Sequence, residues 1–410
     1  MKALHVLAQR PSLTGSGVTL EALVRQANLA GIDQAAIVGV PEGDAPQLGG
    51  LPPERIHPLS FGGEELPFAV PGMSDVMPYA STRYSSMSEA QLGCYRGAWR
   101  THLAQVIDAF RPEMIHAHHV WLLSAMIKDV APNVPLAVHS HSTGLRQMKL
   151  CPHLAQEVKA GCARAERFYV LHRQNGSELQ RALGVDASRV EIVGAGYREE
   201  LFFFGDDGAN RKDRLLYIGK YSAAKGLPWL LEALERLLEK GASVELHVAG
   251  TGAGSEADAL EAKMRQLAPA VVMHGQVDQQ QLATLMRSCA VAVLPSMYEG
   301  LPLVLVEAMA CGCRLVATAL PGVTEQLAPH LGDALHTIAP PRRVNVDQPV
   351  PEDLPAFVDE LVGAIESALA APPLADPALT MPEAIAPFTW ASVCERVFTS
   401  WRALARRAAP

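Results

Sequence analysis

The sequence predicts an α/β protein with two doubly wound domains, because short apolar segments alternate with segments of helical length along its 410 residues. This alternation is typical of parallel sheets whose two faces are both covered by helices. Near the midpoint a polar stretch, Gly205–Asp213, interrupts the alternation as a linker would. We therefore expect domains at residues 1–205 and 206–385, with a terminal helical segment at 386–410.

The short apolar runs give the expected strands, and longer amphipathic runs such as 226–239, 278–288, 354–369 and 389–407 give helices. Residues 62–88 have no clear period, and a loop of that length inside a compact domain is usually functional. The expected strands are 3–8, 35–40, 55–61, 114–118, 135–140, 167–172 and 189–195 in the first half, and 214–219, 244–250, 271–275, 291–296, 314–319 and 333–338 in the second.

Composition excludes several classes of function. A net charge of −8 argues against nucleic acid as a principal partner, because phosphate binding needs a basic surface. No apolar run approaches the ~20 residues that span a bilayer. The seven cysteines show neither disulfide-like nor zinc-like spacing, which favours buried thiols in a reducing cytoplasm.

Two glutamates stand out in the segment PSMYEGLPLVLVEAMACG, residues 295–312. Glu299 follows the apolar strand Val291–Leu294, and Glu307 lies eight residues later inside an otherwise apolar helix. A carboxylate in such a place is costly unless a partner hydrogen-bonds it. Ligand hydroxyl groups are suitable partners, so the pair predicts a site for a sugar and a ribose.

Two lysines flank the turn that opens the second half of the chain. Lys220 and Lys225 lie where the strand at 214–219 passes into the next helix. Ligands of doubly wound sheets bind at the carboxyl ends of the strands. We therefore expect these cations to neutralise a diphosphate leaving group, although most lysines are simply solvated.

Backbone groups near the glutamates are further candidates for donor contacts. The N–H groups around Gly300, Leu301 and Leu303 begin a helix and are expected to face the ligand. The turn that contains Val277 follows another strand and is expected to hold a nucleotide base through its backbone.

A glycine pair follows the first strand. Gly15 and Gly17 open the first helix and let the backbone approach an anion. Leu20 leaves the G-x-G-x-x-G pattern incomplete, and no acidic residue ends the second strand. A nicotinamide enzyme is therefore disfavoured.

Histidines recur at alternate positions in the first half, at His116 and His118 and again at His139 and His141. Period-two geometry places each pair on one face of its strand. Such clusters bind metals, so a metal-dependent hydrolase stays open as an alternative, although no acidic ligand follows at a suitable spacing. We assign no metal site and expect His141 to reach the ligand, with Arg146 beside it to bind an anionic acceptor or a phosphate.

Together these motifs resemble those of the retaining glycosyltransferases with two facing Rossmann-like domains, the GT-B fold, and in particular family four. The E-x7-E motif of 295–312 and the segment Gly219–Gly226, similar to the family's G-R-x-x-x-x-K-G, carry the resemblance most specifically. The glycine loop, the position of His141 and the aromatic helix that begins near Trp390 also match. In such proteins the last helix crosses back to pack on the N-terminal domain.

The resemblance implies roles for individual residues. The first domain would bind the acceptor and the second the nucleotide sugar, with Glu299 on the transferred sugar and Glu307 on the ribose hydroxyls. The expected catalytic residues are Glu299, His141 and Lys225; the expected donor-binding residues are Gly15, Gly17, Lys220, Lys225, Val277, Gly300, Leu301, Leu303 and Glu307; and Arg146 is expected to contact the acceptor.

The chain also departs from the family pattern. Lys220 replaces the usual arginine, so its phosphate contact would be a point charge rather than a planar fork. Ala195–Arg198 stands where the family has N-G-V-D, and Pro302 replaces a frequent glycine and removes one backbone donor.

The resemblance implies a cytoplasmic enzyme that transfers a hexosyl unit from a nucleotide-diphosphate sugar, UDP-linked by expectation, to an acceptor hydroxyl in cell-envelope polysaccharide or glycoconjugate synthesis. No cofactor is required. A small acceptor such as malate is an alternative, as is a non-catalytic nucleotide-sugar sensor. Peripheral contact between the basic end Trp401–Arg407 and the inner face of the membrane also stays open.

Overall fold

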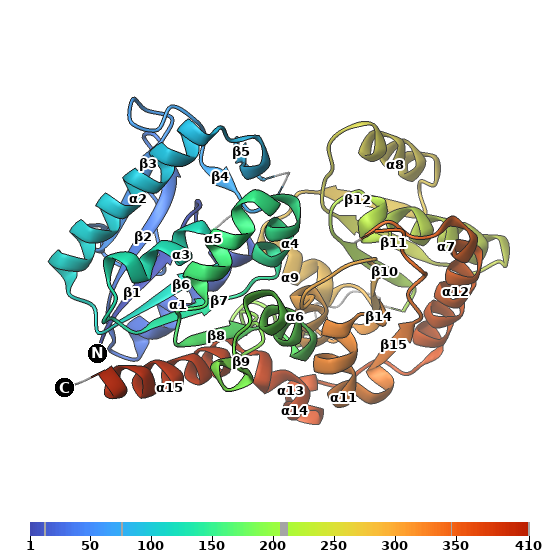
Figure 1. The fold of residues 1–410 in the computed structure, drawn as a ribbon. Coiled ribbons are helices and arrows are strands. Elements are labelled where there is room, and N and C mark those ends of the chain that lie inside the picture. Colours follow the sequence, from blue (N-terminus) through green and yellow to red (C-terminus); the bar gives the residue numbers. More distant parts are fainter. Residues whose placement is uncertain (12–13, 75–76, 206–211, 346, 409–410) are drawn as a thin grey trace. The chain divides into compact units, whose positions relative to one another are not determined.

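Two units of similar size make up the chain in the computed structural model, which describes residues 1–11, 14–74, 77–205, 212–345 and 347–408 (Figure 1). The first unit is Met1–Ala195 with Trp390–Pro410, and the second is Gly196–Thr389. The predicted linker lies largely outside the described residues, since Asp206–Arg211 belongs to the undescribed part.

The first unit is built on a parallel sheet of seven strands in the order β3-β2-β1-β6-β7-β8-β9. Every strand predicted for this half is present, and the segment 62–88 adds only the short pair β4 (Pro71–Gly72) and β5 (Thr82–Arg83). The strands are β1 (Lys2–Leu7), β2 (Asp33–Pro41), β3 (Ile56–Phe61), β6 (Met114–His118), β7 (Leu136–His139), β8 (Arg167–Val170) and β9 (Val190–Ile192).

Helices cover both faces of this sheet (Figure 1). Alternate residues of β1 separate the two faces: Leu4 and Val6 join the cluster packed by α2 and α3, whereas Ala3 joins the cluster packed by α1 and α15. The helices are α1 (Gly15–Leu29), α2 (Glu89–Phe110), α3 (Leu122–Val130), α4 (Thr143–Leu150), α5 (Pro152–Cys162), α6 (Arg173–Leu183) and α15 (Trp390–Ala408).

The C-terminal helix α15, red in Figure 1, belongs to the first unit. Its buried side chains, Val397 and Trp401 among them, pack against Ala3 of β1 and Ala22 of α1. Arg396 donates a hydrogen bond from Nη2 to the Val193 carbonyl at 2.9 Å. The packing of the last helix on the N-terminal domain, which the family resemblance implied, is therefore seen here.

The second unit has a parallel sheet of six strands in the order β12-β11-β10-β13-β14-β15. Every strand predicted for this half is present. The elements are β10 (Arg214–Ile218), α7 (Leu227–Glu239), β11 (Glu245–Ala249), α8 (Ser255–Gln266), β12 (Val271–Gly275), α9 (Gln279–Arg287), β13 (Val291–Leu294), α10 (Leu303–Ala310), β14 (Arg314–Thr318), α11 (Ala328–Leu331), β15 (Leu335–Ile338), α12 (Leu354–Ala370), α13 (Pro377–Thr380) and α14 (Pro382–Ile385).

Apolar packing of α7 and α12 covers one face of this sheet, with Trp229 meeting Phe357 edge to face at a ring separation of 6.3 Å. Because both sheets are wholly parallel, all the loops that leave the strands of one sheet at their carboxyl ends gather on one edge of that sheet. None of the described helices is both long enough and apolar enough to cross a membrane.

Candidate functional site

Two loops at the carboxyl edge of the second sheet are packed against each other. The loop after β10 contains Gly226, and a Cβ added there would lie 2.0 Å from the Pro295 carbonyl oxygen in the loop after β13. The Met297 N–H also donates to the Ala224 carbonyl at 2.9 Å. Gly226 has φ +78°, so both its backbone angle and its surroundings require glycine.

This packing brings together two of the predicted site residues. The Lys225 ammonium forms an ion pair with the Glu299 carboxylate, Nζ to Oε1, at 2.6 Å. Ser296 donates from its hydroxyl to the same Oε1 at 2.9 Å. The Glu299 side chain is 16% exposed and that of Lys225 30%, so the pair is accessible to a ligand at one edge.

The second predicted lysine lies beside this pair in the chain. Lys220 is exposed, and none of the described residues pairs with its ammonium group. The Tyr217 hydroxyl donates to the Lys220 carbonyl at 2.7 Å and so holds the turn. Burial, with a contribution from the Glu299 carboxylate, raises the pKa of Tyr217, which keeps this donor protonated.

Glu307 lies on α10, and burial raises the pKa of its carboxyl group to about 7. No hydrogen bond or ion pair joins this carboxyl group to any residue that the structure describes. A half-buried carboxylate without a partner is destabilising in the free protein. A ligand with hydroxyl donors would relieve that cost.

The start of α10 only partly matches expectation. None of the described residues accepts a hydrogen bond from the N–H of Gly300 or Leu301, so both donors are available. The Leu303 N–H, by contrast, donates to the Leu301 carbonyl at 3.0 Å. The expectation that it faces a ligand is therefore wrong for the free protein, because Pro302 precedes the helix in a non-helical conformation and turns this donor back on the loop.

Two other glycines allow close packing of loops at this edge, and the sequence analysis did not predict that role. A Cβ on Gly322, after β14, would lie 1.9 Å from the Gly300 carbonyl oxygen. A Cβ on Gly250, after β11, would lie 1.9 Å from that of Gly219. Both follow a strand of a doubly wound sheet, and that position was the signal that could have identified them. Val277, half-buried in the loop after β12, lies on the same edge.

In the first unit the glycine loop opens α1. Gly15 is the first residue of the helix, it is exposed, and a Cβ added there would meet no atom within 4 Å. The Thr14 side chain caps the helix by accepting from the Gly17 N–H at 3.2 Å. Ser12 and Leu13 of this loop lie outside the described residues.

His141 lies just beyond β7, at the carboxyl edge of the first sheet. Its Nε2 is 3.1 Å from Nδ1 of His118, and its ring stacks on that of His139 with centroids 4.5 Å apart. Burial and the neighbouring histidines lower the pKa of His141 well below its ordinary value, so the ring is neutral near pH 7. Arg146 is half-buried on α4, which begins two residues later.

Backbone strain marks the same edge of the first sheet. His119 has φ +72° and Ser142 has φ +66°, which is the left-handed region that residues with a Cβ seldom adopt. Thr143 Oγ1 is 3.0 Å from Nδ1 of His119 and ties the two loops together. Strained positions of this kind cluster at functional sites. The sequence carries no signal that would have identified them.

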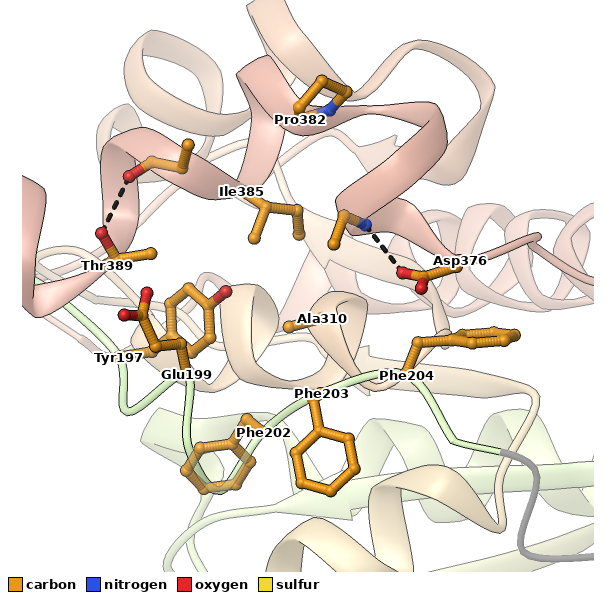
Figure 2. A pocket seen from close by; sticks show the side chains of 12 residues that line it. Tyr197, Glu199, Phe202, Phe203, Phe204, Ala310, Asp376, Pro382, Ile385 and Thr389 are labelled. Carbon is orange, nitrogen blue, oxygen red and sulfur yellow. Dashed lines mark hydrogen bonds between the residues drawn. The ribbon is translucent and has the colours of Figure 1, made fainter.

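A cavity of about 300 Å³ lies within the second unit, and Ala310 at the end of α10 is one of its lining residues (Figure 2). It is enclosed by the segment after Gly196 and the segment before Trp390, which pair through an isolated bridge between Tyr197 and Thr389. Figure 2 shows aromatic rings on one side and short helical turns on the other. The lining residues include Tyr197, Phe202, Phe203, Phe204, Ala310, Asp376, Ile385 and Thr389.

Comparison with known proteins agrees with this architecture. Residues 14–196 match the model of the glycosyl transferase 4-like domain, and residues 212–345 match that of the glycosyl transferases group 1. A glycogen synthase of Mycobacterium tuberculosis is 28% identical over 232 residues, which are 53% of this chain and 54% of that protein. D-inositol 3-phosphate glycosyltransferase 2 of Catenulispora acidiphila is 33% identical over 181 residues, 40% and 42% of the two chains. The chain thus spans about half the length of the curated relatives it matches.

Solved structures cover the chain more fully at lower identity. Sucrose-phosphate synthase of Thermosynechococcus elongatus superposes with a TM-score of 0.68 at 17% identity, over 98% of this chain and 99% of that one. Anabaena HepE in complex with UDP and glucose gives 0.63 at 15% identity, over 98% and 99%. These similarities show the two-domain GT-B fold. The two domain models together match most of the residues, and the chain belongs to the glycosyltransferase family that combines these two domains.

Proposed function

We propose that this glycosyltransferase moves a hexosyl unit from a UDP-sugar to an acceptor hydroxyl with retention of the anomeric configuration. The observation that carries the proposal is the Glu307 carboxyl group, which is half-buried and has no partner among the described residues. The 2′- and 3′-hydroxyls of a ribose are donors that would satisfy it. The structural neighbours solved with UDP-glucose and with UDP-2-fluoro glucose favour UDP over other nucleotides.

The Lys225–Glu299 ion pair suggests how the donor binds. When a diphosphate enters, Lys225 exchanges the Glu299 carboxylate for a phosphate oxygen, and Lys220 adds a second cation. Glu299 is then free to accept hydrogen bonds from the hydroxyls of the sugar. The ion pair of the free protein is thereby replaced by two interactions with the ligand, one from Lys225 to the diphosphate and one from Glu299 to the sugar. Binding of the sugar and binding of the diphosphate are therefore coupled.

Transfer breaks the bond between the anomeric carbon and the phosphate oxygen and forms a bond from that carbon to the acceptor oxygen on the same face. The acceptor proton passes to the departing phosphate oxygen. Lys220, Lys225 and the N–H groups of Gly300 and Leu301 stabilise the charge that develops on the diphosphate. Neutral His141 and Arg146, in and after the loop that follows β7 of the first unit, are assigned to acceptor binding. The acceptor class that we propose is a hydroxylated cell-envelope saccharide or glycolipid.

Donor binding is tested by thermal shift of the purified chain with UDP-, GDP- and ADP-glucose, because a ligand of the folded form raises its melting temperature. We expect UDP-glucose to give the largest shift and Glu307→Ala to lose most of it while its circular dichroism stays unchanged. An equal shift in the variant would refute the role of Glu307.

Transfer is tested by release of UDP on addition of cell-envelope acceptor fractions, followed by NMR of the product. An α-linked product from an α-linked donor supports retention, and a β-linked product refutes it. Binding of donor without release of UDP from any acceptor fraction would favour the nucleotide-sugar sensor.

A further inference from the structure

A group of three buried histidines in the first unit has no role in the function proposed above. His116 and His118 lie on β6, and His139 lies on the neighbouring strand β7, where the strand register places it opposite His118. One ring nitrogen from each of the three lies within 4.8 Å of those from the other two. The residues are at most 2% exposed.

These rings are short of hydrogen-bond partners. Both nitrogens of His116, both of His139 and Nε2 of His118 are buried with no partner among the described residues. Leaving a buried polar atom unsatisfied costs about 1–3 kcal/mol. For these five atoms the cost is on the order of the whole stability of a domain. A partner that the protein chain itself does not supply would remove most of that cost.

The arrangement and chemistry of the three rings indicate which kind of ligand would bind between them. The rings are nearly parallel, with centroids 4.9 Å apart for His116 and His118, 5.6 Å for His116 and His139, and 6.0 Å for His118 and His139. Each ring offers one nitrogen to the group, and imidazole nitrogens are common ligands of transition metals. No carboxylate among the described residues joins the group. This donor set excludes Mg²⁺ and Ca²⁺, which take oxygen ligands, and suits Zn²⁺ or a similar transition metal.

We propose that His116, His118 and His139 bind one transition-metal ion, Zn²⁺ by preference, inside the first unit. Three imidazoles with a water in the fourth position form a familiar tetrahedral set. Metal–nitrogen bonds of about 2.0–2.1 Å place ligand nitrogens about 3.4 Å apart. The rings therefore turn inward by about 1 Å when the ion binds. The sequence-based expectation assigned no metal site, with a histidine-bound metal only as an alternative.

The proposed ion would also orient the predicted catalytic histidine. The free nitrogen of His118 is Nε2, and its Nδ1 faces Nε2 of His141 at 3.1 Å. With Nε2 on the metal, His118 carries its proton on Nδ1 and donates it to His141. Nε2 of His141 is then an acceptor, and its own proton lies on Nδ1. His118 is thus a positioning residue, and the transfer step itself does not pass through the ion.

The experiment uses the full chain without an affinity tag, stripped of metal by a chelator and titrated with Co²⁺ and Zn²⁺. We expect about one Co²⁺ per chain with the visible absorption of a four-coordinate ion, displaced by Zn²⁺. The His139→Gln variant should lose this absorption. The double variant His247→Gln/His274→Gln is the control, because that pair, joined at 2.9 Å in the second unit, is the partly exposed place where metal would bind adventitiously.

Absorption that survives in His139→Gln, or that disappears in the control, would overturn the proposal. If His139→Gln does not fold, the wild-type chain is measured instead. A metal bound to the folded form must raise its melting temperature by mass action, so Zn²⁺ should give such a rise. No rise would mean that water or nothing fills the group. None of these readouts depends on donor binding, so failure here leaves the proposed transferase function intact.

Discussion

Replacing Glu307 by glutamine should make the free protein more stable and the donor complex weaker. The folded state raises the pKa of this carboxyl group from 4.5 to about 7. Because the folded pKa is the higher one, the folded protein binds more protons than the unfolded chain between these values. The contribution of the group to stability is therefore full below about pH 4.5 and declines as the pH rises to about 7.

At 1.36 kcal/mol per pKa unit, the loss in the wild type amounts to about 3 kcal/mol by pH 8. Glutamine carries no charge to desolvate and does not titrate. We therefore expect Glu307→Gln to exceed the wild type by about 3 kcal/mol at pH 8 and to match it to within about 1 kcal/mol at pH 5.

The assay is urea unfolding of both proteins at a series of pH values, followed by circular dichroism and by the fluorescence of the native tryptophans. The same variant should lose most of the thermal shift with UDP-glucose. A stability difference between variant and wild type that does not depend on pH would refute the reasoning, because it would mean that the carboxyl group is not desolvated.

Three further perturbations test the rest of the structure. Lys225→Ala should lower the rate of transfer, measured as UDP release, about 100-fold or more, because it removes a cation that stabilises the leaving group. Lys240→Ala removes only an exposed ion pair and should leave the rate unchanged. Equal rates for the two variants would contradict the site. Gly250→Ala places a methyl group 1.9 Å from the Gly219 carbonyl oxygen and should destabilise the second unit by about 3 kcal/mol. Urea unfolding measures this, and an unchanged free energy of unfolding would contradict the close packing of the two loops. Trp401→Ala removes a fully buried ring from the contact between α15 and the sheet, and should lower the stability of the first unit by about 4 kcal/mol. Calorimetry measures this, and an unfolding transition of the first unit that is the same in variant and wild type would contradict it.

Local pattern was enough to predict the sheets. The strands of both units are short apolar runs bounded by turns, and this pattern is a property of neighbouring residues. The motif around Glu299 and Glu307 predicted a buried acid, and the structure gives a half-buried one, Glu307, whose pKa is raised by desolvation.

What the sequence could not predict depends on contacts between distant loops. The Lys225–Glu299 ion pair joins residues 74 positions apart, and the Leu303 N–H is occupied because of the backbone path through Pro302. The unsatisfied histidine nitrogens likewise follow from the register of β6 on β7 and from the lack of hydrogen bonds to the described neighbours. Neither can be read from the order of residues in the sequence.

The placement of α15 has a consequence for how the chain is made. The first unit needs Trp401 and its neighbours to cover β1 and α1, yet these residues leave the ribosome only after the whole of the second unit. The N-terminal domain cannot complete its core during translation and must wait, partly open, while the whole of the second unit is synthesised. A fragment that stops at residue 195 would keep that apolar surface exposed to water, so the two domains are not separable by a single cut. Removal of residues 391–410 should therefore destabilise the N-terminal domain rather than the second unit, which precedes them directly in the sequence.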